Sequence, residues 1–187
     1  MKKLKLAFTC LDLEAALVQR VTEWVADIQL KSPFDRGQVL VPLQVFQGAI
    51  PSHQTGPEAP MQAKAPAVAI RCSSASWVRQ VGEACINFAI LTWDDNLNRQ
   101  GYQDILNIAN RIVSGLQERV VINKAFVLLD HPIHFDEILD PAVDFFPFHL
   151  GLVTAHFGLM SYSPDYAPYG VLSGNDVVDV GGFSSAE

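Results

Sequence analysis

The segment from Glu83 to Asp94 constrains the fold more than any other part of this chain. Because successive residues of a strand point to opposite faces, its alternate residues form two separate sets. The first face would carry Ala84, Ile86, Phe88, Ile90 and Thr92, and the second Cys85, Asn87, Ala89, Leu91 and Trp93. Both sets are largely apolar, which predicts a central strand that is covered on both sides.

Two other segments have the three- and four-residue spacing of amphipathic helices. Residues 11–30 predict one helix, with Asp12 as its N-cap and Lys31-Ser32-Pro33 at its end. Residues 100–118 predict a second helix. The apolar positions are Leu13, Leu17, Val21, Trp24, Val25 and Ile28 in the first, and Tyr102, Ile105, Ala109, Ile112, Val113 and Leu116 in the second.

The remaining ordered segments predict further strands. Pro42 interrupts the β-rich segment 38–47, which indicates two short pieces or an edge strand. The other predicted strands are a short one at 67–72, one at 120–129, an irregular or short edge strand at 131–138, and a long one at 148–162. The predicted fold class is α+β, with two helices on a mostly antiparallel or mixed sheet of four or five strands.

Two segments are rich in Pro, Gly and Ser. Residues 48–66 predict a long loop or extended arm, and residues 163–187 predict a C-terminal arm. The expected organisation is therefore one α+β domain over residues 1–162, which includes the loop 48–66, followed by the arm 163–187.

Composition excludes several classes of protein. The 187 residues are 49% hydrophobic and 18% charged, which is sufficient for a core and unlike a disordered or fibrous chain. The net charge of −7 disfavours a protein that grips nucleic acid through its phosphates. No apolar run approaches the roughly 20 residues that span a bilayer. The apolar stretch before Cys10 is too short for a signal peptide, so Cys10, Cys72 and Cys85 are interpreted as reduced thiols of a cytosolic protein.

The residues that could carry chemistry are few and scattered. His131 and His134 lack a third metal ligand at a typical spacing, and Asp94-Asp95 is typical of a turn before a helix. The Gly-x-Ser-x-Gly, Walker and dinucleotide-binding patterns are absent, while Gly151 and Gly158 are interpreted as sites of close packing or a bulge. We therefore predict no catalytic residue, metal or cofactor. A small α+β enzyme that uses Asp94, Asp95, His131 and His134 is the less favoured alternative.

The run Phe145-Phe146-Pro147-Phe148 is the most unusual local composition. Three phenylalanines at the start of one strand have two explanations. They cover the end of the sheet, or they form an apolar patch that faces a partner.

Several motifs occur in the same order as in one known family. These are Val45-Phe46-Gln47-Gly48-Ala49-Ile50-Pro51 after the first helix, the short strand Ala67–Arg71, the strand that ends in Thr92-Trp93-Asp94-Asp95, the helix start Gln100-Gly101-Tyr102-Gln103-Asp104, and Phe146-Pro147-Phe148-His149-Leu150-Gly151. Over residues 11–162 the chain resembles the tail terminator, or tail completion, proteins of long-tailed bacteriophages.

The resemblance implies assembly, without catalysis. Such proteins form a ring, typically six-fold, that caps the head-proximal end of the tail tube and presents a joining surface to the head connector. The implied partners are other copies of the chain, the tail tube protein and the head connector or stopper protein, without a membrane. The implied location is the tail–neck junction of the virion, after assembly in the host cytoplasm. The alternative within this class is another neck adaptor, such as a head completion protein.

Under this hypothesis, particular residues would meet partners. The loop 48–66 and the arm 163–187 would contact neighbours, and the expected interface residues are Phe145, Phe146, Phe148, Pro51, Tyr166 and Tyr169. Asp94 and Asp95 would face the lumen, where acidic groups would let DNA pass as cargo without sticking. Neutralising such acids without any change in DNA passage would count against that hypothesis.

Overall fold

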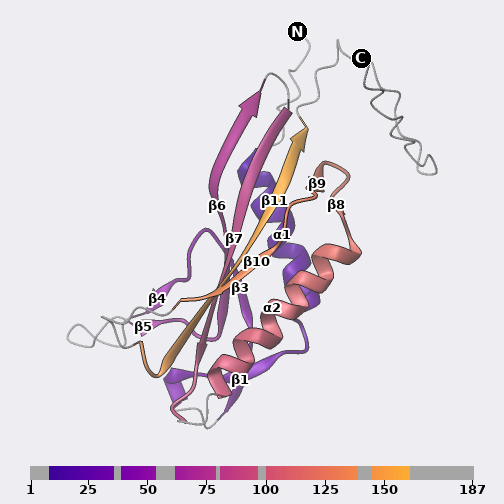
Figure 1. Ribbon diagram of the computed structural model, residues 1–187. Helices are drawn as coiled ribbons and strands as arrows, with labels where there is room; N and C mark the ends of the chain where they lie inside the picture. The colour runs from indigo at the N-terminus through magenta and orange to yellow at the C-terminus, as the bar shows by residue number, and fades with distance from the viewer. Residues whose placement is uncertain are drawn as a thin grey trace, which may run out of the picture.

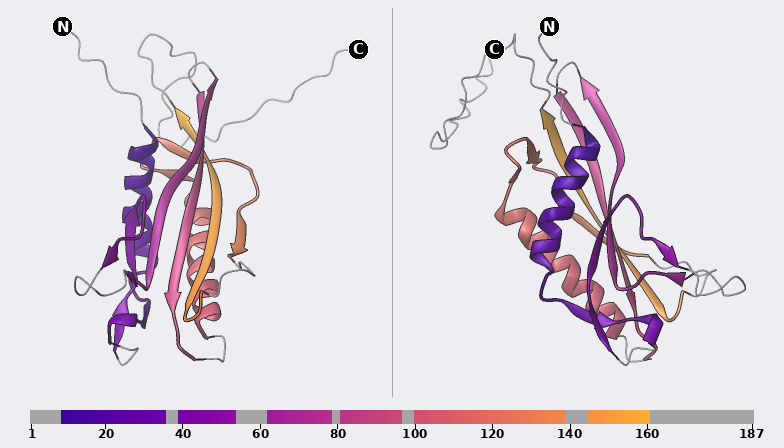
Figure 2. Two further views of the ribbon diagram at one scale, coloured as in Figure 1. Left: turned by 90° about the vertical axis from the view of Figure 1, so that its left-hand side faces the viewer. Right: turned by 180° about the vertical axis from the view of Figure 1, so that it is seen from behind.

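The computed structural model describes residues 9–35, 39–53, 62–78, 81–96, 100–138 and 145–160. The fold is α+β, as the sequence predicts: two helices pack on a twisted, curled sheet, and a long β-hairpin extends beyond the helices (Figure 1). Views from the side and from behind show the same elongated outline (Figure 2).

Seven described strands form the main sheet, compared with the four or five that were predicted. The strand order is β3-β6-β7-β11-β9-β8, with β10 also paired to β11. The pairings are antiparallel except for that of β3 with β6. The bounds are β3 Gln44–Gln47, β6 Ala67–Val78, β7 Val81–Trp93, β8 Val121–Ile122, β9 Phe126–Leu128, β10 His134–Glu137 and β11 Phe148–Met160.

The predicted central strand is β7. It pairs with β11 over its whole length, from Trp93 opposite Phe148 to Val81 opposite Met160. On its other side it pairs with β6, with a bulge between Cys72 and Ser74. This double pairing satisfies the backbone of β7 on both edges.

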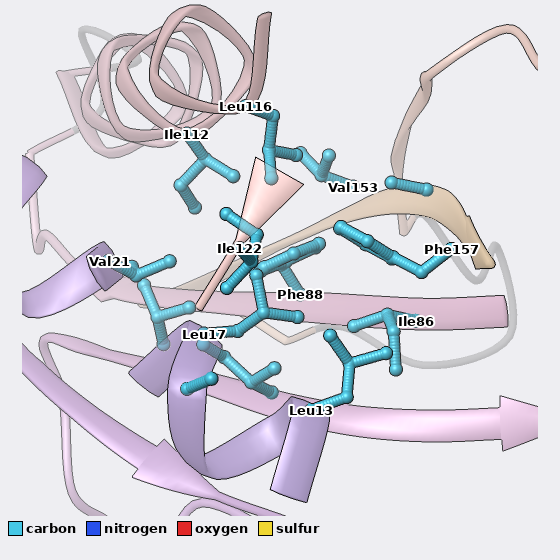
Figure 3. Close-up of a cluster of buried hydrophobic side chains, with 14 of the residues drawn as sticks. Leu13, Leu17, Val21, Ile86, Phe88, Ile112, Leu116, Ile122, Val153 and Phe157 are labelled. Atoms are coloured by element: carbon cyan, nitrogen blue, oxygen red, sulfur yellow. The ribbon is translucent and has the colours of Figure 1, made fainter. Parts of the chain in front are cut away.

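Both helices, α1 (Cys10–Trp24) and α2 (Gln100–Glu118), cover the same face of the sheet. Phe88 lies at the centre of the resulting core and is fully buried. Each side chain of this size that leaves water stabilises the fold by about 1.5–3 kcal/mol. Figure 3 shows the packed side chains from both helices and the sheet: Leu13, Leu17, Val21, Ile86, Ile112, Leu116, Ile122, Val153 and Phe157.

The first helix is shorter than predicted and begins differently. Thr9 is the N-cap, and Asp12 is the third residue of a capping box: Asp12 accepts from the Thr9 amide at 2.8 Å, while its own amide donates to Thr9 Oγ1 at 3.3 Å. The prediction of Asp12 as N-cap was therefore wrong. The helix ends at Trp24, and the later apolar residue Ile28 instead precedes a short strand, β1 (Gln29–Lys31), which pairs with β2 (Leu40–Pro42).

Other boundaries follow from local turn chemistry. The two short pieces predicted around Pro42 are β2 and β3, and the predicted helix 100–118 has the bounds of α2. The predicted strand 120–129 is instead the hairpin β8–β9, because Asn123 and Lys124 both adopt positive φ, at 49° and 57°. Positive φ at two central residues is the geometry of a tight hairpin turn.

The two faces of β7 differ, which corrects the expectation of complete cover. On the face away from the helices, Leu91 and Trp93 are buried beneath Ile50 and Ala65 of the segment 48–66. Farther along that face, Cys85, Asn87 and Ala89 are half-buried. The segment 48–66 also contains the paired strands β4 (Ser52–His53) and β5 (Gln62–Ala63). Residues 54–61 and the predicted arm 163–187 lie outside the described residues.

We predict that Gly151→Ala destabilises the protein by about 1–3 kcal/mol, because a Cβ at this position would overlap the Ile105 side chain of α2. The matched control is Gly158→Ala in the same strand. Among the described residues, the one side chain near its new methyl group is that of Leu129, whose flexible end lies 3.3 Å away. Urea unfolding of both variants measures the difference. Equal stability would contradict direct packing of α2 on β11.

Candidate interaction surfaces

A buried ion pair organises the end of the sheet where β7 stops and β11 begins, which we call the sheet base. Asp94 is fully buried, and Lys31 of β1 donates to its Oδ1 at 2.6 Å. The Asp94 amide donates to the carbonyl of Pro147 at 2.9 Å. One residue thus connects β1, the end of β7 and the entrance to β11.

This burial corrects one sequence-based assignment. Asp94 was predicted to face a lumen, but a fully buried carboxylate that is paired with Lys31 presents no charge to passing DNA. Asp95 is exposed, and its position at a lumen stays a prediction.

More polar groups lie around this pair. The hydrogen bond to Asp94 raises the pKa of Lys31, so the lysine stays charged at neutral pH. Burial raises the pKa of Asp104 on the second turn of α2, and a hydrogen bond from Gln100 at 3.1 Å acts in the opposite direction. The imidazole of His149 packs directly on Gly101 at the start of α2. Among the described residues, Asp94 Oδ2 and His149 Nε2 are the buried side-chain atoms without a hydrogen-bond partner.

The three phenylalanines of the predicted patch differ in burial, and a partner contact stays a prediction. Phe148 packs with Leu91 and Trp93 and so covers the end of the sheet. Phe145 is half-buried, whereas Phe146 keeps 47% of its surface exposed. Phe146 is thus the member of the patch with most surface available to a partner.

The other predicted interface residues lie at or beyond the edge of the described structure. Pro51 is exposed and lines a shallow hollow together with Phe34, Ser52 and Lys64. The ammonium of Lys64 lies 5.7 Å from the centre of the Phe46 ring. Tyr166 and Tyr169 are outside the described residues.

A second apolar surface, which the sequence analysis missed, lies at the opposite end of the molecule. We call it the hairpin end; it consists of Trp77 and Val78 of β6 and Val81 of β7, with exposed fractions of 57%, 76% and 68%. The Trp77 indole lies against Gly82, where a Cβ would approach its ring within 2.6 Å. The predicted strand 67–72 ended before these residues, and only the full length of β6 brings them together.

Between the two ends, polar side chains lie on the face of the sheet away from the helices. His156 Nδ1 lies 2.9 Å from Glu83 Oε1, and the ring of His131 stacks on that of His156 with a centroid distance of 4.9 Å. Asn87 and Thr154 hydrogen-bond in the same face at 3.2 Å. The described residues contain no group of three or more His, Cys, Asp or Glu arranged to hold a metal ion.

The residues of the alternative enzyme prediction do not meet. Asp94 follows the base end of β7, whereas His131 stacks on His156, which pairs with Cys85 nine residues earlier. At about 3.3 Å per strand residue, these groups lie roughly 30 Å apart. They therefore form no common site in this fold.

The three cysteines are free and half-buried. Burial, followed by a hydrogen bond with the Cys10 side chain, raises the pKa of Cys72 to about 12. The Cys72 thiol also donates to the Ser74 carbonyl at 3.3 Å. Cys72 is therefore a protonated, poorly nucleophilic thiol at neutral pH.

In comparison with known proteins, the sequence matches no family model and no curated protein. Among the described residues, neither helix has both the length and the apolar character that crossing a membrane requires.

We predict that Lys31→Met lowers the free energy of unfolding by about 3 kcal/mol at pH 7, because it leaves the buried Asp94 carboxylate unpaired. The double variant Lys31→Met/Asp94→Leu should recover most of this loss. The stability contributed by a raised lysine pKa is present below the usual value of 10.5 and lost above it. The difference between wild type and Lys31→Met should therefore shrink above that pH.

The control for this experiment is Arg111→Met, which removes the exposed ion pair with Asp27. Exposed pairs contribute only about 0–1 kcal/mol, so this variant should unfold close to wild type. Similar losses in both variants, measured by denaturant unfolding, would refute the organising role of the buried pair.

We also predict that Cys72 resists alkylation by iodoacetamide at pH 8, because its raised pKa leaves almost no thiolate at that pH. Peptide mass spectrometry of the folded and urea-unfolded chain measures the labelling. Cys72 should be labelled only after unfolding, and rapid labelling in the folded protein would contradict its protonated, covered state.

Proposed function

We propose that this protein is a structural virion protein: a ring-forming tail terminator that caps the head-proximal end of a phage tail tube. One observation carries the proposal. Exposed apolar side chains lie at both ends of the domain: Trp77, Val78 and Val81 at the hairpin end, and Phe146 near the sheet base. A ring subunit requires two such surfaces, because each copy meets its neighbours or the adjoining tube through different patches.

Two other features support this proposal. The ordered motifs at 45–51, 92–95, 100–105 and 146–151 occupy β3, the end of β7, the start of α2 and the entrance to β11, which are adjacent parts of one domain. The Asp94 amide donates to the Pro147 carbonyl and so ties the residue after Phe146 to the end of β7. A fixed apolar side chain associates at a smaller entropic cost than a mobile one.

The test replaces the exposed phenylalanine. Phe146→Ser should reduce the number of rings in negative-stain images, or the fraction of capped tubes when tube protein is present, because it removes apolar contact area from the subunit surface. Thermal unfolding should change little, since Phe146 is nearly half exposed in the single chain. Phe148→Ser is unsuitable because it would also disturb the packing around Trp93.

The matched control is Leu40→Ser, which removes an apolar side chain with 56% exposure on β2, outside the predicted interface. Rings should persist in this variant. Intact rings and capped tubes in Phe146→Ser would remove Phe146 from the interface, and a wild-type chain that forms no ring with or without tube protein would refute the proposal as a whole.

A further inference from the structure

Within the described part of the chain, one long edge of the main sheet pairs with no other strand. On the side of β6 away from β7, β3 pairs only with residues 67–70. No described strand accompanies β6 from Arg71 to Val78 on that side, and this part of the hairpin extends beyond β3 (Figure 2). An unaccompanied edge presents backbone donors and acceptors to another strand.

The side chains of this edge favour strand addition. Glu14 of α1 accepts a hydrogen bond from the Cys72 amide at 2.7 Å, so the backbone of this edge is covered as far as Cys72. Beyond it come the small residues Ser73, Ser74, Ala75 and Ser76, followed by Trp77 and Val78. Arg71 is the sole charged residue of this stretch, so the usual protection by several charges or a proline is missing. The bulge at Cys72–Ser74 bends the edge without closing it.

At the same level, the last described strand on the opposite side of the sheet is β8, which carries exposed side chains. The strand registers align Ser76 with Glu83, Gly158, Val127 and finally Val121 of β8. Val121 and the preceding Val120 are 54% and 48% exposed. Ser76 and Val121 are four strand spacings apart along the sheet, or roughly 19 Å.

Each edge has a charged residue nearer the base and exposed apolar residues nearer the hairpin end. The row that begins at Arg71 continues through Asn87 and Thr154 to His134 of β10, and the exposed Asp136 lies two residues farther toward the sheet base. A cation on β6 thus corresponds to an acid on β10. Toward the hairpin end, β6 carries Trp77 and Val78, and the other side carries Val120 and Val121, which Arg119 and Lys124 flank.

The outlines of the edges also match. On one side of the sheet, β3 pairs with β6 only as far as Ile70, so β6 is the outermost described strand from there to the hairpin end. On the other side, β8 lies outside β9 at the level of Ser76 and Trp77. A projecting strand on one side of the sheet therefore corresponds in level to a recessed edge on the other.

We propose that the open edge of β6 is the site at which a second copy of this chain docks, through its β8 edge, so that the sheet continues from one subunit to the next. In this arrangement β8 of one copy lies beside Ser74–Val78 of its neighbour, and Arg71 faces Asp136. The contact is head-to-tail, because two different edges meet, and such contacts form a ring when the rotation from one subunit to the next closes. Backbone hydrogen bonds supply the pairing, and the apolar side chains supply the buried area. This inference rests on the proposed ring function, whose subunit contact it specifies.

The test is disulfide cross-linking between single-cysteine additions to the full chain. Ser76→Cys and Val121→Cys proteins are mixed and oxidised with copper phenanthroline, and a covalent pair of twice 20.6 kDa is measured on a non-reducing gel. Neighbouring strands bring Cα atoms within the 4.4–6.8 Å that a disulfide spans, so the mixture should cross-link at least about tenfold more than either variant alone. Ser74→Cys and Val78→Cys, on the same face of β6, test the neighbouring registers.

Several controls identify the contact. The unmodified chain reports any background from Cys10, Cys72 and Cys85, and peptide mass spectrometry must locate the bond between positions 76 and 121. Within one chain the two positions are too far apart to bond, so any 76–121 disulfide joins two copies. Arg71→Glu should lower the cross-linking yield, and Asp136→Arg in the partner should restore it.

Each outcome decides the proposal. Cross-linking in the mixture, with rescue by the charge exchange, supports it. Strong pairing of Ser76→Cys with itself would show β6 meeting β6 in a two-fold dimer and would overturn it. Rings seen by native mass without any 76–121 bond in all three registers would overturn the edge contact but leave the ring function standing. A chain that stays monomeric with and without tube protein would overturn both.

Discussion

The pairing of β7 with β11 over thirteen consecutive residues is the constraint on which the rest of the structure depends. It assigns Ile86, Phe88 and Ile90 to the face that both helices cover, together with Val153, Ala155 and Phe157 from the partner strand. A slip of one residue would turn each of these side chains to the other face. The same ladder brings Trp93 opposite Phe148, and therefore closes the sheet base over Asp94.

The two ends of this ladder have different chemistry. At the base, the Lys31–Asp94 pair and the Asp94–Pro147 backbone bond tie three chain segments together. At the other end, β6, β7 and β11 continue past the helices. Among the described residues, little of the chain surrounds Trp77, Val78 and Val81. Buried charge connects the chain segments at the base, whereas apolar side chains face solvent at the hairpin end. This contrast underlies the proposal that the protein acts through association surfaces.

Much of the fold could be predicted from residues that interact locally. The apolar faces of β7, the stripe of α2 and the length of β11 are periodic patterns, and each corresponds to an element close to its predicted bounds. The predictions were wrong where the sequence pattern continues past the end of a helix or strand. Val25 and Ile28 continue the stripe of α1 although the helix has ended, and Asn123-Lys124 makes a hairpin turn without the glycine that usually marks one.

The surfaces were harder to predict because they depend on distant contacts. Asp94 reads as an exposed turn residue until Lys31, 63 positions away, is placed beside it. Residues 73–78 lack an apolar alternation, so only pairing with β7 extends β6 to the exposed Trp77. The composition of the run 145–148 drew attention to Phe146. The register of β11 was needed to tell that Phe146 is exposed and Phe148 is packed.

The central claim, that this chain builds a closed ring, is tested most directly by native mass spectrometry of the unmodified protein, alone and with tube protein, across a concentration series. The account predicts that the 20.6 kDa chain gives way to one dominant closed species of fixed stoichiometry, about six copies, which stops growing as concentration rises. A chain that remains monomeric under all these conditions, or an open-ended ladder of masses without a preferred size, would contradict it.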